Sequence, residues 1–195
     1  MLLRELILRT RSVRRFLQDR SVSLSSLEEL VDLARLSASA SNIQPLKFIL
    51  STDPDTNTRI FPHTSWAGYL EEWEGPAEGE RPAAWIIILG DETLRDSFGC
   101  DHGIAAWSIA LGAAEQGLGT CIMGSVEEEG LREALEVPDH LRVLLALALG
   151  EPAEEVRLEN LRTPGGDIRY WRDGEGVHHV PKRPLDELIV ARYGG

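Results

Sequence analysis

The sequence predicts an α+β fold in which a central sheet is flanked by helices, and three observations indicate it. Residues 83–89 and 143–149 are apolar on both faces, as strands buried inside a layered sheet are. Residues 101–116 are apolar nearly all round and rich in small side chains, which is typical of a helix packed in the interior. A length of 195 residues suits one domain of ordinary size with its own core.

Shorter patterns predict the other elements around these buried segments. We use the spacing of apolar residues, capping-box pairs and breaker residues to place them. In chain order they are a short helix at residues 3–7, a helix at 27–37 opened by the capping box of Ser25 and Glu28, a strand at 46–51, a breaker-rich turn at 53–57, a helix capped by Asp101, a strand at 120–124, and a helix opened by the capping box of Ser125 and Glu128.

Two segments are expected to lie outside the central layers. Residues 168–171 and 177–180 flank a turn-forming tetrapeptide, so we expect a hairpin, with a short terminal helix after Pro184. Residues 63–82 combine aromatic residues, glutamates and breakers, and two interpretations stay open: a lid over a pocket, or a short helix and loop packed on the core. No repeat or linker divides the chain, so we expect one domain over residues 1–195, with residues 160–184 as a hairpin and carboxy-terminal extension.

Charge and hydropathy exclude several classes of function. The formal net charge is −12, which argues against a nucleic-acid binder with a broad cationic face. The longest apolar runs are far shorter than the roughly 20 residues that cross a bilayer, and charges interrupt the amino terminus before a signal-type stretch forms. Cys100 and Cys121 match no disulfide framework or zinc ribbon. We expect a cytoplasmic protein with reduced thiols and neither nucleic-acid nor membrane partners.

Positive charge nevertheless gathers near the two ends of the chain. The first twenty residues hold six arginines but only two carboxylates, and the pair Lys182 and Arg183 lies near the other end. For a single arginine, a solvated surface position is the favoured interpretation. Two or three guanidinium groups that converge on one phosphate, however, make bidentate, charge-assisted hydrogen bonds. A compact anion site is therefore a hypothesis for these clusters.

The lack of several known catalytic motifs in the sequence argues against further classes of enzyme. The sequence has no GxSxG, HExxH, Walker A or EF-hand pattern. Its glycines at 117, 119 and 124 begin like a dinucleotide fingerprint, but they follow a helix instead of a strand. His102, His178 and His179 could serve a metal-dependent hydrolase, yet no pair has the spacing of metal ligands, so no metal site is predicted.

Three separated segments, in this order, together resemble the nitroreductase family of FMN-dependent flavoproteins. Residues 11–16, RSVRRF, resemble its RSxR motif, and residues 39–45, SASNIQP, resemble its SxxNxQP motif. The third segment, residues 101–124, is similar to the family's central dimer helix and the strand end beside the flavin. Residues 180–185 also look like its carboxy-terminal phosphate-binding stretch.

This resemblance implies a mostly antiparallel central sheet and an interlocked homodimer with FMN at the subunit interface. It also implies hydride transfer from NADH or NADPH, through flavin N5, to a nitroaromatic, quinone or similar conjugated small-molecule acceptor by ping-pong kinetics. Two alternatives stay open: a flavin-binding carrier or sensor without reductase turnover, and a reductive dehalogenase of the same superfamily. Because the cofactor carries the chemistry, no side chain is assigned a catalytic role.

The resemblance further implies which residues bind the cofactor. The first motif and the late basic pair would hold the FMN phosphate, the second motif would reach the flavin of the partner subunit, and backbone amides of the third would lie near N5, where glycine permits close approach. The implied residues are Arg11, Ser12, Val13, Arg14, Ser39, Ser41, Asn42, Gln44, Met123, Gly124, Lys182 and Arg183.

Overall fold

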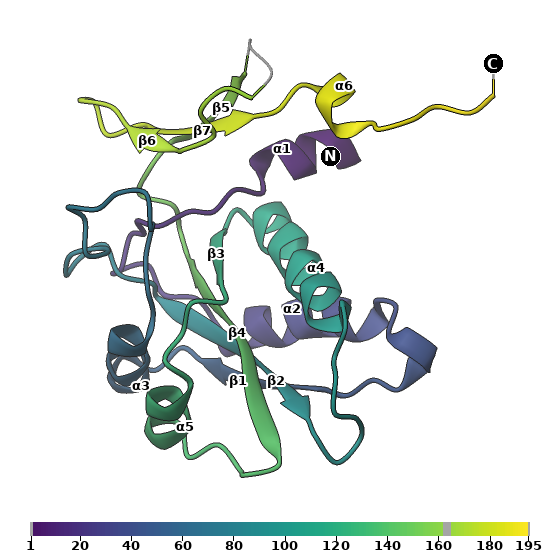
Figure 1. Cartoon of the computed structure of the whole chain (residues 1–195). Helices are drawn as coiled ribbons and strands as arrows, with labels where there is room; N and C mark the ends of the chain where they lie inside the picture. The colour runs from purple at the N-terminus through teal and green to yellow at the C-terminus, as the bar shows by residue number, and fades with distance from the viewer. Residues whose placement is uncertain (1, 162–164, 195) are drawn as a thin grey trace.

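The computed structural model describes residues 2–161 and 165–194, and its centre is a four-stranded sheet (Figure 1). The strands lie in the order β1 (Leu46–Ser51), β2 (Ala84–Asp91), β4 (Leu141–Gly150) and β3 (Gly119–Met123). All three pairs of neighbours are antiparallel, which confirms the expected sheet. Every residue of β2 is buried, as its continuous apolar run predicts for a central strand.

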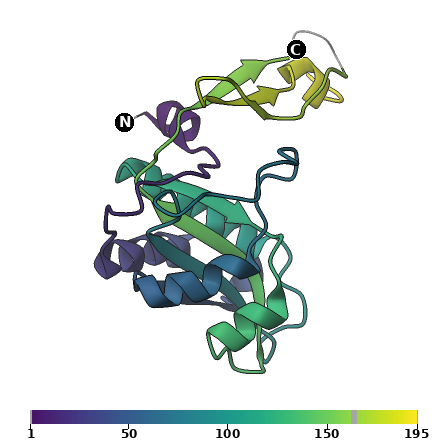
Figure 2. The same cartoon turned by 90° about the vertical axis from the view of Figure 1, so that its left-hand side faces the viewer.

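Helices cover both faces of this sheet (Figures 1 and 2). The pair α2 (Leu24–Leu36) and α4 (Asp101–Glu115) packs on one face, and the pair α3 (Pro54–Ile60) and α5 (Glu128–Ala134) packs on the other. Successive residues of β2 point to alternate faces, so Ile86 joins the core under α2 and α4 while Ile87 joins the core under α3 and α5. The sheet is therefore the middle of three layers.

The small residues of α4 let it approach its neighbours closely, as predicted. A Cβ atom added at Gly112 would collide with the side chain of Leu33 and lie 2.9 Å from Leu30 Cδ2, and both leucines belong to α2. Besides Asp101, seven residues of α4 are buried, one of them Gly112, and together they form a broad buried side of the helix. The close packing expected of this helix on the sheet is confirmed, whereas Gly103, Ile104 and Trp107 leave another side of it exposed.

A second, smaller sheet lies beyond the central layers, next to α1 (Leu3–Arg9) (Figure 1). Strand β7 (His178–Lys182) pairs antiparallel with β6 (Trp171–Arg172), which confirms the expected hairpin, and α6 (Leu185–Leu188) follows Pro184 as predicted. The parallel strand β5 (Val156–Asn160) is an addition, because its half-buried sequence gives only a weak alternation. Of the predicted extension at 160–184, residues 162–164 lie outside the described residues.

The predicted turn at residues 53–57 is wrong, because these residues begin helix α3. Asp53 Oδ2 accepts a hydrogen bond from the Thr56 amide at 2.8 Å, which makes Asp53 the N-cap, and Pro54 takes the first helical position. An Asp-Pro pair is a breaker inside an element but a favoured start for a helix. The same dipeptide therefore fits both interpretations until tertiary packing selects one.

The predicted caps of three other helices are also shifted. Helix α2 is capped by Ser23, whose Oγ accepts from the Ser26 amide at 3.0 Å, so the Ser25 capping box is wrong. The N-cap of α5 is Glu127 and that of α4 is Cys100, so neither Ser125 nor Asp101 takes the expected place. In each case the helix itself forms, since the apolar face and not the cap decides where it packs.

Residues 63–82 leave the central layers, reach the small sheet at Tyr69 and return to the start of β2. At their start the short 3₁₀ helix η2 (Phe61–His63) leads to Trp66, which is buried and packs against Trp85 with ring centroids 6.3 Å apart. Farther along, the Tyr69 ring lies 4.9 Å from that of Tyr170 on the small sheet. One aromatic residue thus belongs to the core and another reaches the small sheet. The lid role of this segment stays a prediction.

Across residues 2–161 and 165–194, no helix combines the length and the apolar character needed to cross a bilayer. The single-domain prediction for residues 1–195 stays a prediction, with the small sheet attached to the central layers through residues 150–156.

A core substitution tests the three-layer arrangement. Ile87 is fully buried in β2 between β1 and β4. Replacing it by Ala removes apolar contacts and leaves a cavity, so Ile87→Ala should lower the free energy of unfolding by about 2–5 kcal/mol. Urea unfolding followed by circular dichroism measures this loss. The exposed control Leu94→Ala should cost under about 1 kcal/mol, and equal losses in the two variants would contradict the assigned layers.

Candidate functional site

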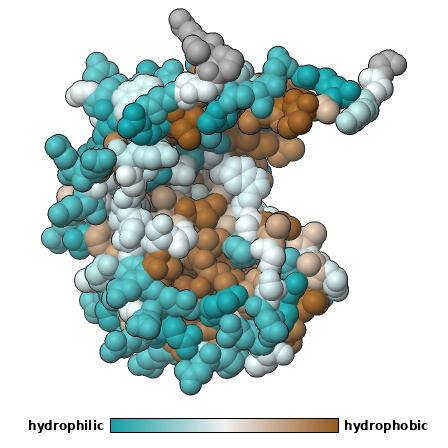
Figure 3. Space-filling view, viewed as in Figure 1, coloured by the Kyte–Doolittle hydropathy of each residue, from teal (hydrophilic) through white to brown (hydrophobic). Residues whose placement is uncertain are grey.

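A cavity of about 370 Å³ lies between the central layers and the small sheet. Figure 3 shows this side of the molecule hollowed between the two parts, with apolar residues inside the hollow. Its lining comes from the amino-terminal segment, α4, β3, β5, β7 and the segment before β6: Thr10, Arg11, Ser12, Arg14, Trp107, Ala110, Thr120, Ile122, Val156, Tyr170, Val180 and Lys182. The fold thus brings the two basic regions of the sequence to one place.

Three of the lining side chains, Arg11, Arg14 and Lys182, are cations. Within the residues that the structure describes, no carboxylate pairs with the side chains of Arg11, Arg14 or Lys182. The arginines that do form carboxylate pairs are Arg15, Arg35, Arg132, Arg142, Arg157, Arg169, Arg172, Arg183 and Arg192. In a protein of net charge −12, an unneutralised group of cations around a cavity marks a site for an anion.

Arg11 is held at the end of α1. Its Nη2 donates to the Ile7 carbonyl oxygen at 2.7 Å, while its buried Nε has no partner. Burial lowers the pKa of this guanidinium, which is the cost of placing a charge in a poorly solvated position. An anion that accepts from Arg11 would offset that cost.

Arg14 is fixed through its backbone as well as its side chain. Its amide donates to Oε1 of Glu154 at 2.5 Å, and the fully buried Glu154 side chain also accepts from Nη2 of Arg172 at 2.9 Å. The Arg14 guanidinium lies 4.7 Å from the ring centroid of Tyr170, in cation–π contact. Glu154 therefore ties the amino-terminal segment to the small sheet.

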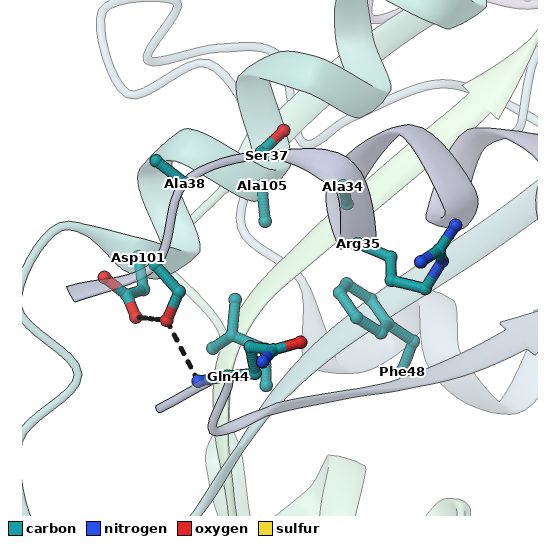
Figure 4. Close-up of a pocket in the computed structure, with 10 residues that line it drawn as sticks. Ala34, Arg35, Ser37, Ala38, Gln44, Phe48, Asp101 and Ala105 are labelled. Atoms are coloured by element: carbon teal, nitrogen blue, oxygen red, sulfur yellow. Dashed lines mark hydrogen bonds between the residues drawn. The ribbon is translucent and has the colours of Figure 1, made fainter. Parts of the chain in front are cut away.

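Ser39 and Gln44 line a different, smaller cavity of about 180 Å³. Figure 4 shows Gln44 beside Asp101 at one end of this cavity, with Phe48 and Arg35 toward the other. The two cavities share no lining residue, although α4 contributes Ala105 to this one. Within one protomer, the two predicted halves of the cofactor site are therefore separate.

The loop that carries Gln44 is strained and is held by a buried carboxylate. Ser41, Asn42 and Gln44 all have positive φ angles, 53°, 54° and 54°, in and beside the 3₁₀ helix η1 (Ala40–Asn42). Asp101 is buried, and its Oδ2 accepts from Ser39 Oγ at 2.7 Å. Left-handed backbone at non-glycine residues costs free energy and persists only where the surroundings fix it. Asp101 supplies part of that fixation instead of capping α4.

The remaining predicted residues take positions away from the cavities. The Val13 side chain is buried in the core against Gly119, and its backbone amide donates to the Thr120 carbonyl oxygen at 2.9 Å, so both are already engaged. Ser41 and Asn42 are exposed on their loop, and Arg183 pairs with Glu187. These four residues do not join the group around Arg14.

Met123 and Gly124 lie at the end of β3. Met123 is buried in the core, and Gly124 is exposed just beyond the strand. A Cβ atom at Gly124 would meet only Leu145 Cδ2, at 3.7 Å, and the φ angle of Gly124 is not positive. Nothing within the described chain requires a glycine there, and the backbone at this position is sterically open.

The sequence did not reveal several residues that shape the cavity lined by Arg11, Arg14 and Lys182, hereafter the cation cavity. Tyr170 and Trp107 line it, and Glu154 binds Arg14 from 140 positions along the chain. For Tyr170, the only sequence signal of a position facing the cavity was the alternation of apolar and polar residues in the predicted hairpin. Glu154 stands in a polar stretch without a periodic pattern, so its burial depends on tertiary structure.

The paired histidines of β7 have separate surroundings. His178 is fully buried, and burial followed by the charge of Arg14 lowers the pKa of its imidazole to about 4. His179 contacts Asp173 Oδ2 at 3.0 Å and Glu159 Oε1 at 2.7 Å, and these hydrogen bonds raise the pKa of its imidazole. Among the described residues, no group of three His, Cys, Asp or Glu side chains is arranged to hold a metal ion.

The Nitroreductase family model matches residues 7–151, and the chain belongs to the nitroreductase family. An oxygen-insensitive NADPH nitroreductase of Salmonella typhimurium is 30% identical over 200 residues, which cover 97% of this chain and 78% of that protein. An FMN reductase (NADPH) of Bacillus subtilis is 27% identical over 164 residues. That match covers 76% of this chain but only 65% of the reductase, so the chain spans less than two thirds of this relative.

Solved structures confirm the fold. A nitroreductase family protein from Clostridium novyi NT has a TM-score of 0.64 at 24% identity, covering 93% of this chain and 94% of that one. An FMN-dependent nitroreductase from Clostridium difficile R20291 has a TM-score of 0.63 at 25% identity, covering 76% and 87%. The resemblance inferred from the motifs is confirmed at the level of family and fold.

Removing the carboxylate that holds the strained loop should loosen it. Asp101→Ala leaves the Ser39 hydroxyl and the Ala40 amide without their acceptor. Each hydrogen bond to a charged group is worth about 1.5–3 kcal/mol, so losing both is expected to lower the free energy of unfolding in urea by about 3–6 kcal/mol. Faster amide hydrogen exchange in residues 39–44 should accompany it. Asp139→Ala, at an exposed carboxylate, serves as the control, and an unchanged exchange rate in Asp101→Ala would show that the loop holds itself.

His179 makes stability depend on pH in a defined direction. A histidine whose folded pKa is raised stabilises the protein fully below its unfolded pKa of about 6.5, and that contribution is lost as pH rises through the folded pKa. His179→Gln should therefore be more destabilising, relative to wild type, at about pH 5.5 than at about pH 9. Thermal unfolding at both pH values measures the difference. The same deficit at both would mean that the imidazole is not charged in the folded state.

Proposed function

We propose that this protein is an FMN-dependent oxidoreductase that takes hydride from NADH or NADPH and passes it to a nitroaromatic, quinone or similar conjugated acceptor by ping-pong kinetics. The observation that carries the proposal is the cavity where Arg11, Arg14 and Lys182 meet, none of them paired with a carboxylate of the described residues. The names of the relatives, an NADPH nitroreductase and an FMN reductase, support the same activity.

The residues present fit the phosphate and the ring system of FMN. Arg11, Arg14 and Lys182 offer charge-assisted donors to a dianion, each hydrogen bond contributing about 1.5–3 kcal/mol before desolvation. Trp107 and Ile122, both on the cavity wall and partly exposed, offer apolar surface to an aromatic ring. The cavity volume of about 370 Å³ falls in the range of small-molecule sites, about 300–1,000 Å³.

When bound, FMN supplies the hydride chemistry, and the protein supplies binding, orientation and charge. The three cations bind the phosphate and so fix one end of the cofactor. Gly124 leaves the end of β3 free of a side chain, which admits a ring edge to the backbone. Burial raises the pKa of Cys121, in the same strand, to about 11, so this thiol stays protonated and packs without reacting.

A homodimer would complete the site. The loop at residues 39–44 lines a cavity separate from the cation cavity of its own protomer. Large apolar side chains are exposed on α1, α4 and α6, which is unusual for a monomer and typical of an interface. They include Leu3, Leu8, Ile104, Trp107, Leu185 and Leu188. We therefore place Ser39, Ser41, Asn42 and Gln44 of each subunit against the flavin held by its partner.

Phosphate binding is tested by removing two of the cations. The double variant Arg14→Ala/Lys182→Ala should raise the dissociation constant for FMN at least about 100-fold, because two charge-assisted contacts are lost. Quenching of flavin fluorescence on titration gives the constant. Arg157→Ala removes an arginine that pairs with Glu155 outside the cavity and should leave FMN binding unchanged. Equal FMN affinity in the two proteins would refute the assignment.

Reductase activity is tested on the loaded protein. Under anaerobic conditions NADH or NADPH should bleach the visible flavin absorbance, and menadione or a nitroaromatic should restore it with repeated turnover. Bleaching without turnover would favour the carrier or sensor, and turnover confined to a halophenol would favour the dehalogenase. Failure of both nicotinamides to bleach the bound flavin would exclude the proposed reaction.

A further inference from the structure

We propose that His178 is a positioning residue that holds the guanidinium of Arg14 in the cation cavity without neutralising it. The inference rests on the proposed function, since it assigns how one of the phosphate-binding cations is kept available. It concerns a residue of β7 that does not itself line the cavity.

The contact between the two side chains fixes the state of the imidazole. Nη1 of Arg14 and Nε2 of His178 lie 3.1 Å apart, within hydrogen-bond distance. A guanidinium has donors only, so Nε2 must be the acceptor and cannot carry a proton. The ring is then neutral, with its proton on Nδ1. The contact therefore requires the Nδ1–H tautomer, although this buried Nδ1 has no hydrogen-bond partner among the described residues.

The surroundings keep the ring neutral. His178 is fully buried, its ring centroid lies 5.1 Å from that of Tyr170, and the cationic groups of Arg14 and Arg172 face it from the amino-terminal segment and from β6. On its own strand the adjacent charged group is His179, which also disfavours a second positive charge. Protonation of His178 would add a buried charge beside two guanidinium groups, so it is disfavoured by both burial and repulsion.

A neutral acceptor can orient a guanidinium without cancelling its charge, which a carboxylate cannot do. Arg172 is oriented by Glu154 and Arg15 by Glu80, and each of these pairs cancels the charge of the arginine. Arg14 is oriented instead by His178, by the Ser12 carbonyl oxygen at 3.3 Å from Nη1, and by the face of Tyr170. All three contacts hold the guanidinium without supplying a negative charge. Its full positive charge stays available to an anion in the cavity.

Glu154 and His178 hold different parts of Arg14. The carboxylate accepts from the backbone amide of Arg14 and from the side chain of Arg172, and it forms no ion pair with the Arg14 side chain in the described part of the chain. The negative charge thus fixes the backbone while the neutral imidazole fixes the guanidinium. This arrangement predicts that an acceptor at the Nε2 position matters more than the imidazole ring itself.

Two amide substitutions show whether the acceptor at the Nε2 position or the imidazole ring itself matters. His178→Gln places an amide oxygen near the Nε2 position and retains an acceptor for Arg14, whereas His178→Asn places it near Nδ1 and loses that acceptor. In the full-length protein freed of flavin, we expect His178→Gln to bind FMN within about 3-fold of wild type and His178→Asn to bind it about 10-fold more weakly. Riboflavin, which lacks the phosphate, should bind both variants as it binds wild type.

A double-mutant cycle shows whether His178 acts through Arg14. In the Arg14→Ala background, His178→Asn should cause no further loss of FMN affinity, because the group it positions is gone. Additive losses, or an equal loss of riboflavin binding, would overturn the proposal and assign His178 a structural role only. If His178→Asn fails to fold, His178→Gln carries the test, since wild-type affinity then requires the retained acceptor and a loss of 10-fold or more contradicts it.

Nitrogen NMR of the flavin-free wild type provides a readout that does not depend on FMN. The imidazole of His178 should be the neutral Nδ1–H tautomer at neutral pH, and Arg14→Ala should shift its Nε2 resonance. A protonated ring or the Nε2–H tautomer would overturn the inference. A protein that shows the expected tautomer but binds no FMN would instead refute the proposed function, so the two failures are distinguishable.

Discussion

The site depends on one buried carboxylate that joins distant parts of the chain. Glu154 accepts from the backbone amide of Arg14 and from the guanidinium of Arg172, and its side chain is fully buried. Together with the contacts of the Arg14 guanidinium to His178 and Tyr170, this link holds the amino-terminal basic segment against the small sheet that carries Lys182. Burying an anion is costly unless it is paired and hydrogen-bonded, and both conditions are met here. The same link leaves the Arg14 side chain free of a counter-charge.

The central layers provide a rigid support for this arrangement. Strand β3 and helix α4 contribute Thr120, Ile122, Trp107 and Ala110 to the cavity wall. Strand β3 pairs with β4 in the central sheet, and α4 packs on one face of that sheet. The loop at residues 39–44 is anchored on the same helix through Asp101. A single helix thus positions both cavities, which is why a change in its packing would be felt at the cation cavity and at the loop.

Periodicity predicted the layers but not the contacts that build the site. The strands around Ile87 and Leu147 were predictable because burial on both faces leaves a continuous apolar run. Asp53 and Pro54 were misread because the dipeptide that breaks an element also starts a helix. The meeting of Arg11, Arg14 and Lys182 followed from family motifs and not from spacing. The roles of Glu154 and His178 could not be predicted, since a lone buried polar residue gives no periodic pattern. Their shared partner Arg14 lies 140 and 164 positions away along the chain.

The proposed site requires that unneutralised cations from both ends of the chain bind one phosphate. The most direct measurement is calorimetric titration of the wild-type, flavin-free protein with FMN and, in parallel, with riboflavin, which differ only in that group. The account predicts that FMN binds at least about 100-fold more tightly and that added salt reduces this preference. Equal affinity for the two flavins would contradict it.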